Sequence, residues 1–295
     1  VRSRRQRQMC IRDRDKVEAQ IQFGWTVDYF GIGDLVQYVN AVTDEEINQL
    51  FAEYADLYEF DYGSYSQEDW EKSVKVQASY EIAIKRFLDD GGYHAFTTNF
   101  EDLYGMKQLP GLAVQRLMAQ GYGFAGEGDW KTAALDRLLK VMSRNQSTGF
   151  MEDYTYELAA GQESILQSHM LEVDPSLASN KPKIIVSPLG IGDREDPARL
   201  VFDGKAGDGV VVSMADFGTH YKLLINEVSA FEPTVPAPNL PVARVLWEVK
   251  PNFQDGVKAW LENGGGHHTV VSLNVTTDQM ITYAKLVDLE YVVIK

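Results

Sequence analysis

The chain has 295 residues, a formal net charge of −15 and a hydrophobic content of 44%. These values are typical of a globular protein with about two domains, and they exclude disordered, collagen-like and coiled-coil chains. The negative charge repels phosphate and anionic lipid, and no apolar run approaches the ~20 residues of a membrane span, so we expect neither nucleic acid nor a membrane as a partner. A single cysteine excludes an internal disulfide and favours the cytoplasm.

Residues 1–14, VRSRRQRQMCIRDR, differ from the rest because they hold six of the 28 basic residues and the only cysteine. The segment has neither the apolar stretch of a signal peptide nor the serine-rich, amphipathic character of a transit peptide. A basic arm that binds nucleic acid is the alternative, which the acidic remainder disfavours. We interpret residues 1–14 as a foreign leader, and we expect the protein's own N-terminal part to be missing and its C-terminus to be truncated.

Residues 15–146 alternate helical patterns with short apolar runs. The sequence TDEE at 43–46 is a capping box that opens one helix, and a longer helix over 66–88 ends at the glycines of DDGG. Short strands over 94–100 and 122–125 alternate with helices over 112–120 and 130–142. This order predicts βαβ units and therefore an open parallel α/β sheet domain.

Residues 147–295 are dominated by apolar runs of strand length separated by turn residues such as DG. The predicted strands cover 150–158, 184–186, 200–202, 210–214, 221–225 and 242–249. Strands that follow one another without helices predict a mostly antiparallel β-barrel or a sandwich. Two helices, over 253–262 and 277–286, flank a strand over 268–273 near the end of the chain.

The sequence GYGFAGEGDW at 121–130 carries the first candidate for chemistry, Glu127. A short strand leads into this glycine-rich turn, and Asp129 is placed to cap the following helix. Loops after the carboxyl ends of strands are where α/β sheets bind ligands. The alternatives are a solvated turn carboxylate and a phosphate loop, and the latter lacks a lysine and carries a repelling charge.

The sequence FMEDYTY at 150–156 carries the second candidate. Alternation along a strand places Glu152 on one face with Phe150 and Tyr154, and Asp153 on the other face. A carboxylate between aromatic rings is costly to bury unless it is paired or bound to a metal. Exposure on an edge strand is the alternative.

Five histidines are present, and three of them lie in distinctive surroundings. His169 lies in the strand-like stretch SHMLEV, and His267 and His268 follow three glycines and lead into an apolar strand. Because adjacent residues of a strand point to opposite faces, we expect at most one of this pair to enter a given site. A structural hydrogen-bonding role is the alternative for each histidine, and we favour it for His94 and His220.

No motif of a serine hydrolase, zinc protease, P-loop or Rossmann turn competes with these candidates. Taken together, GYGFAGEGDWKTAAL, FMEDYTYEL, SHMLEVDPS, LGIGDREDPARL and GGGHHTVVS resemble the L-arabinose isomerase family, and the resemblance covers nearly all of residues 16–295. It implies a fucose isomerase-like α/β domain and a C-terminal β-barrel domain. It also implies a cytoplasmic enzyme of arabinose catabolism that works as a homo-oligomer, a hexamer when intact.

The resemblance further implies a divalent metal held by two glutamates and two histidines, which are Glu127, Glu152, His169 and His268 here. Such a ligand set suits Mn²⁺, with Co²⁺ as a substitute, better than a closed zinc site. The implied reaction converts L-arabinose to L-ribulose, and D-galactose to D-tagatose, through an ene-diol, with Glu127 and Glu152 as the catalytic proton carriers. Phe100 and Tyr154 are expected to line the sugar pocket.

Two alternatives remain open at this stage. One is a related aldose isomerase, such as one for L-fucose. The other is a catalytically incomplete metal-binding fragment, since the family's sites include residues from a domain that precedes the region present here. We expect the four metal-binding side chains to converge at the boundary between the two domains.

Overall fold

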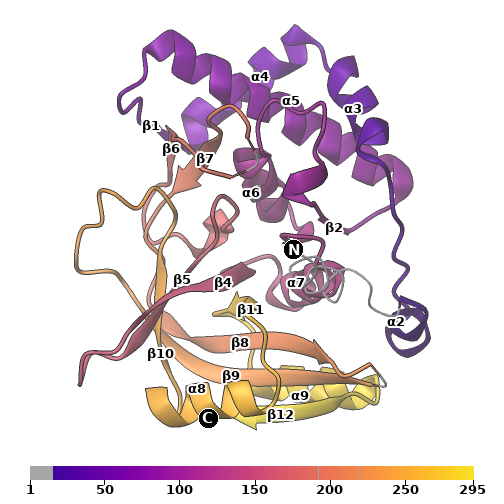
Figure 1. Ribbon diagram of the computed structural model, residues 1–295, viewed down its shortest axis with the longest axis vertical. Helices are drawn as coiled ribbons and strands as arrows, with labels where there is room; N and C mark the ends of the chain where they lie inside the picture. The colour runs from indigo at the N-terminus through magenta and orange to yellow at the C-terminus, as the bar shows by residue number, and fades with distance from the viewer. Residues whose placement is uncertain (1–15, 192, 219) are drawn as a thin grey trace.

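The computed structural model describes residues 16–191, 193–218 and 220–295. Helices α3, α4 and α5 form one end of the molecule and a large sheet forms the other, with α7 between them (Figure 1). No helix in the described ranges is both long enough and apolar enough to cross a membrane. The expected leader, residues 1–14, lies outside the described residues.

The helical end begins with α2 (Lys16–Phe23), α3 (Ile32–Ala41), α4 (Asp44–Leu57) and α5 (Gln67–Gly91). The capping box is present at the start of α4, where the Thr43 hydroxyl accepts from the backbone N–H of Glu46 and the Glu46 carboxylate accepts in return. Ser66 caps α5, and Gly92 ends it in the left-handed conformation. The predicted helices of this region are confirmed.

Strands β2 (Ala95–Thr97) and β3 (Gly123–Ala125) are parallel neighbours, and they alternate with α6 (Gly111–Ala119) and α7 (Trp130–Ser143). Gly123 lies so close to α7 that a Cβ at this position would approach the carbonyl oxygen of Ala133 to 2.3 Å. This contact explains the glycine, and it fixes the helix that begins beside the loop 126–129.

The large sheet contains seven strands in the order β10-β5-β4-β11-β8-β9-β12. Its strands are β4 (Thr148–Glu157), β5 (Ser164–Ser168), β8 (Gly207–Asp216), β9 (Tyr221–Phe231), β10 (Val245–Val249), β11 (His268–Ser272) and β12 (Glu290–Ile294). All their pairings are antiparallel except β9 with β12. Because β10 also pairs with β9, the described strands from β10 to β9 form a closed ring of hydrogen-bonded neighbours.

Helices α8 (Phe253–Glu262) and α9 (Thr277–Leu286) lie beside this sheet at the C-terminal end of the chain (Figure 1). Side chains from β8, β9 and β11 share one buried cluster with Leu135 and Leu139 of α7. Helix α7 therefore packs against β8, β9 and β11, and it also contacts β4.

The parallel pairing is more limited than a single open sheet. A separate sheet joins β1 (Glu59–Phe60), β6 (Lys183–Val186) and β7 (Ala198–Val201), with β1 parallel to β6 and β6 antiparallel to β7. β1 comes from the first predicted domain, whereas β6 and β7 come from the second. The sequence pattern did not reveal this pairing because two residues are too short to show any periodicity.

Candidate metal centre

Three neighbouring strands bring two histidines to one glutamate. Glu152 of β4 lies directly opposite His268 of β11 and, on its other side, opposite Ser168, the last residue of β5. His169 follows Ser168. Glu152, His169 and His268 each offer a ligand atom, and these three atoms all lie within 4.8 Å of one another. The strand register therefore assembles three of the four predicted side chains.

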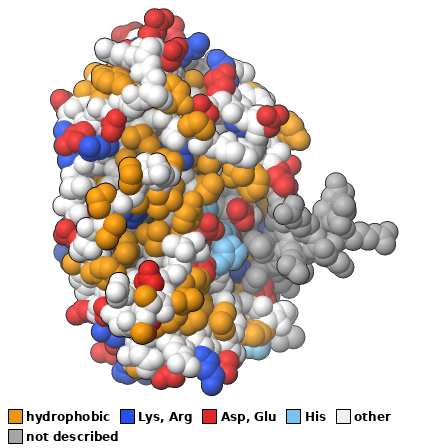
Figure 2. All heavy atoms as spheres, turned by 60° about the vertical axis from the view of Figure 1, so that its left-hand side comes forward, with side chains coloured by type: hydrophobic (Ala, Val, Ile, Leu, Met, Phe, Trp, Pro, Cys, Tyr) orange, Lys and Arg blue, Asp and Glu red, His pale blue; other side chains and the backbone are white. Residues whose placement is uncertain are grey.

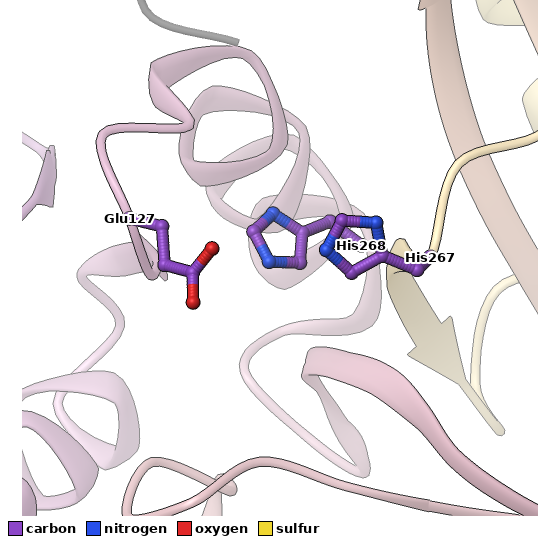
Figure 3. A group of neighbouring side chains, drawn as sticks. All are labelled: Glu127, His267 and His268. Carbon is purple, nitrogen blue, oxygen red and sulfur yellow. The ribbon is translucent and has the colours of Figure 1, made fainter. Parts of the chain in front are cut away.

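Glu127 approaches the same place from the loop between β3 and α7. It forms a second group with His267 and His268, again with one ligand atom from each residue within 4.8 Å of the others. Figure 3 shows its carboxylate pointing toward the two imidazole rings. The backbone of Glu127 has φ = 60°, a left-handed conformation that is rare for residues other than glycine and costs about 1 kcal/mol or more.

His268 belongs to both groups, and only one of its ring nitrogens is engaged. Nδ1 lies 3.1 Å from Oδ2 of Asp129, and the side chain is 4% exposed. An ionised carboxylate can only accept, so Nδ1 carries the proton and donates it to Asp129. Nε2 is buried, and no residue that the structure describes forms a hydrogen bond with it. A neutral imidazole of this tautomer presents an unshared lone pair at Nε2, which is the form that ligates metals.

His169 has the same kind of support. Nδ1 lies 2.5 Å from Oε2 of Glu172, and both side chains are largely buried. The Nε2 side of the ring faces Gly126, where a Cβ would come within 3.1 Å of that nitrogen. A carboxylate behind each histidine fixes the ring orientation and leaves Nε2 for a ligand, as is common around protein-bound metals.

Phe150 separates the two histidines from the protein interior. It is fully buried two residues before Glu152, and its ring centroid lies 4.8 Å from that of His169 and 5.1 Å from that of His268. An apolar ring at this position keeps both imidazoles in place and lowers the local dielectric.

On one face of the molecule a histidine is visible at mid-height with acidic side chains beside it (Figure 2).

Neighbouring charges outweigh the effect of burial on the pKa of two groups at the site, Asp129 and His169. Burial alone would raise the pKa of Asp129, but Lys131, His268 and Thr132 hold it well below its ordinary value. Burial would lower the pKa of His169, but Glu172 and, more weakly, Glu152 and Glu127 raise it above its ordinary value. A cation in the site would replace the proton that these carboxylates attract.

The donor set fits a divalent cation. Two glutamate carboxylates and two Nε2 nitrogens are ligands that Mn²⁺, Co²⁺ and Zn²⁺ all accept. The partnerless Nε2 of His268, buried beside ionisable carboxylates, is the structural feature that a bound cation would explain. Glu127 and Glu152 are partly buried, and a cation would offset the cost of withdrawing their charges from water.

Two expectations about the local geometry were wrong. His267 lies next to the site because β11 begins only at His268, so strand alternation does not apply, and the two rings are 4.2 Å apart. The strand expected at His169 ends at Ser168, and a bend follows. The reading of Glu152 as an edge-strand residue is also excluded, since β4 lies between β5 and β11.

The two predicted pocket residues, Phe100 and Tyr154, lie on different elements of the structure. Phe100 starts a short 3₁₀ helix (Phe100–Asp102) and packs against an apolar cluster of the helical end. A register shift between Asp153 and Thr155 interrupts the alternation at Tyr154, whose hydroxyl lies 3.5 Å from Sδ of Met170.

Sequence reasoning missed Glu172 and gave Asp129 only a capping role. Asp129 does cap α7 through the backbone N–H of Thr132, and its second oxygen reaches His268. The spacing of His169 and Glu172, three residues apart, was the available signal for the second pair.

Comparison with known proteins gives consistent results. The family model for the L-arabinose isomerase central domain matches residues 3–145, and that for the C-terminal domain matches residues 147–290. The chain is 95% identical over 289 residues to L-arabinose isomerase 2 of Bacillus licheniformis and 86% identical over 289 residues to L-arabinose isomerase of Oceanobacillus iheyensis. It is 53% identical over 288 residues to L-arabinose isomerase of Geobacillus stearothermophilus.

Each of these matches covers 98% of the chain. The chain spans 61% of the length of the first two relatives and 58% of the third. The matched residues include every side chain of the candidate metal centre. The chain belongs to the L-arabinose isomerase family, of which it contains the central and C-terminal domains.

Proposed function

We propose that this chain carries the metal centre and the proton-transfer groups of an aldose–ketose isomerase that converts L-arabinose to L-ribulose, and also D-galactose to D-tagatose. The observation that carries the proposal is the convergence of Glu152, His169 and His268, with Nε2 of His268 buried and unpartnered. The names of the relatives support the substrate.

The metal ligands in this proposal are Glu127, Glu152, His169 and His268, and the cation is Mn²⁺, with Co²⁺ as a substitute. When bound, the cation supplies a Lewis acid that polarises the sugar oxygens. The reaction moves a proton between C1 and C2, so it needs a carboxylate close to each carbon. Glu127 comes from the loop before α7 and Glu152 from β4, and in this proposal they share the roles of base and acid.

The remaining protein supports this chemistry by position. Asp129 and Glu172 orient the two imidazoles, and Phe150 excludes water from behind them. Phe100 and Tyr154 remain our candidates for the wall of the sugar pocket. His267, next to Glu127, is a further polar side chain within reach of a bound sugar.

The finer description of the fold and assembly belongs to the same proposal. We infer that the closed ring of strands is the β-barrel of a C-terminal domain covering residues 147–295, and that residues 15–146 form a fucose isomerase-like central domain. The pairing of β1 with β6 then joins the two domains. The expected assembly is a homo-oligomer, a hexamer in the full-length protein, in the cytoplasm.

The test is formation of L-ribulose from L-arabinose by this chain in the presence of Mn²⁺, with a panel of pentoses and hexoses as competing substrates. The expected result is turnover that requires Mn²⁺ and is lost in Glu152→Gln. Higher turnover on L-fucose would contradict the substrate assignment.

A second candidate function is metal binding without turnover. It is favoured because the chain spans only 61% of the length of L-arabinose isomerase 2 of Bacillus licheniformis. Tight Mn²⁺ binding with no ribulose would support it over the isomerase activity of this chain.

A further inference from the structure

Arg199 is a buried guanidinium without a salt-bridge partner in the part of the chain that the structure describes. It lies on β7, is 2% exposed, and pairs in register with Ile185 of β6. Its donors go to backbone carbonyls, one of them that of Met170 at 3.1 Å and others those of Ser187 and Pro188, while Nε has no partner. Burying an arginine in this way is costly, so the arrangement needs a reason.

The carbonyl of Met170 belongs to the bend that carries the His169–Glu172 pair. Within the described ranges, none of the carbonyls of residues 169–173 accepts from a backbone N–H of a turn or loop. Side chains hold two of them instead: Arg199 donates to the carbonyl of Met170, and Gln115 donates to that of Val173. The hydroxyl of Ser168 lies 3.2 Å from the carbonyl oxygen of His169 and 2.6 Å from that of Ala243, which is its nearer acceptor. The bend is therefore positioned by side chains, and Arg199 is the charged member of this set.

The charge of Arg199 also faces this pair. Burial lowers the pKa of Arg199 to about 10, and the carboxylate of Glu172 is the strongest of the nearby charges that oppose this effect. Asp196, Tyr154 and Tyr65 follow in that order. The guanidinium therefore donates to the bend at Met170, and its positive charge attracts the carboxylate of Glu172, which accepts from His169.

We propose that Arg199 is a positioning residue for the metal centre: it fixes the 169–172 bend so that Glu172 accepts from Nδ1 of His169 and Nε2 faces the cation. The inference rests on the proposed metal centre and extends it to a residue on a different sheet. Arg199 reaches the cation only through Met170, Glu172 and His169, a chain of contacts that begins in the β1-β6-β7 sheet.

The variants that test this are Arg199→Met, which removes charge and donors, and Arg199→Lys, which keeps the charge but not the planar fork. The matched control is Arg244→Met, because the Arg244 side chain also donates to a backbone carbonyl, that of Val235, but it is paired with Asp203 and forms no hydrogen bond or ion pair with the described residues 169–172. Two measurements are made on the full chain. The first is the dissociation constant for Mn²⁺ alone by calorimetry, and the second is the tautomer of His169 from its imidazole ¹⁵N shifts without metal, at a pH where the shifts show a neutral ring in the wild type.

We expect Arg199→Met to weaken Mn²⁺ binding by up to about tenfold, the lower end of the loss typical for a direct partner of a metal ligand, because Arg199 acts on His169 through the bend and Glu172. Its His169 should lose the Nδ1–H tautomer, Arg199→Lys should fall between it and the wild type, and Arg244→Met should match the wild type in both measurements. Circular dichroism establishes that each variant is folded. A merely structural role would lower the melting temperature without changing the tautomer.

Wild-type affinity and tautomer in folded Arg199→Met would overturn the proposal. If that variant does not fold, the same result in Arg199→Lys would overturn it. A wild-type chain that binds no Mn²⁺ would instead overturn the metal centre, and the tautomer measurement would still decide the role of Arg199.

Discussion

Glu152 and His268 lie directly opposite each other on the antiparallel strands β4 and β11. Opposite residues of such a pair have their Cβ atoms only about 5 Å apart and on the same face of the sheet. A carboxylate and an imidazole are thus presented together by backbone register, before any side-chain contact is considered. Because a slip of one residue would reverse the face of every side chain on β4, the hydrophobic pattern that sets the register also sets the metal site.

The first prediction concerns the Glu152 carboxylate. Glu152→Gln keeps the size and strand position of the side chain but replaces an anionic ligand with a weakly coordinating amide. We expect the Mn²⁺ dissociation constant to rise at least ~10-fold, the lower end of the losses seen even for outer partners of metal ligands. Asp153→Asn is the matched control, since its carboxylate accepts from Tyr156 instead. Equal affinity of Glu152→Gln and wild type in calorimetry would remove Glu152 from the site.

The second prediction separates the two roles of Asp129. Asn is as good an N-cap as Asp, so Asp129→Asn should keep the cap of α7, whereas Asp129→Ala should lose the cap and be about 1 kcal/mol less stable than Asp129→Asn. Both variants also remove an anionic partner of buried Lys131, whose Nζ lies 3.2 Å from Asp129, and both should be less stable than wild type. Both variants lose the anionic partner of His268 and should bind Mn²⁺ about 10–100-fold more weakly. The measurements are urea unfolding in EDTA and Mn²⁺ calorimetry. Equal stability of Asp129→Asn and Asp129→Ala, or unchanged Mn²⁺ affinity in both, would contradict this division of roles.

Much of the fold was predictable because the local signals agreed with the tertiary structure. The capping box at Thr43, the cap at Ser66 and the glycine stop at Gly92 each define a helix end through a backbone requirement that the sequence shows directly. Most strands of the large sheet were predictable for a similar reason, because an apolar run of strand length between turn residues is typical of a strand. The exception is β5, which is not among the predicted strands, since the sequence pattern places the strand-like stretch at 168–173.

The pairings between distant segments were less accessible. β1 has two residues and pairs with a strand more than a hundred positions later, and no local pattern encodes that contact. The candidate site shows the same division. Glu127, Glu152 and the histidines could be selected because the residues next to them in the sequence are distinctive. The roles of Glu172 and Arg199 depend on a bend at Met170, which only the folded structure shows.

The third prediction is a pH dependence that arises away from the metal centre. Asp136 is fully buried, accepts from the backbone N–H of Phe124, and has its second oxygen 4.0 Å from Nζ of Lys140 without a hydrogen bond. Burial raises the pKa of Asp136 to about 7 from an ordinary 3.8. The folded state therefore keeps a proton that the unfolded state releases above pH 4.

The stability contributed by this proton is present below pH 4 and is lost as the pH rises toward 7, by up to about 4 kcal/mol. Asp136→Asn should remove this decline, because the amide keeps an oxygen for Phe124 and does not ionise. Urea unfolding between pH 5 and pH 8 measures it, with exposed Asp56→Asn as the control. The same decline in Asp136→Asn and wild type would show that Asp136 is not its source.

The last prediction uses the backbone of Glu127. Its φ of 60° suits glycine, so Glu127→Gly should relieve strain and stabilise the metal-free chain by about 1 kcal/mol while weakening Mn²⁺ binding. Glu127→Gln should also weaken Mn²⁺ binding but leave the strain, and so the stability in EDTA, unchanged. The two variants distinguish two reasons for a glutamate at this position. In one, the carboxylate binds the metal although the backbone is strained, and in the other, the side chain stabilises the fold. A Glu127→Gly chain that is less stable than wild type in EDTA would show that the carboxylate stabilises the loop itself, and that its position is not a cost borne for the metal.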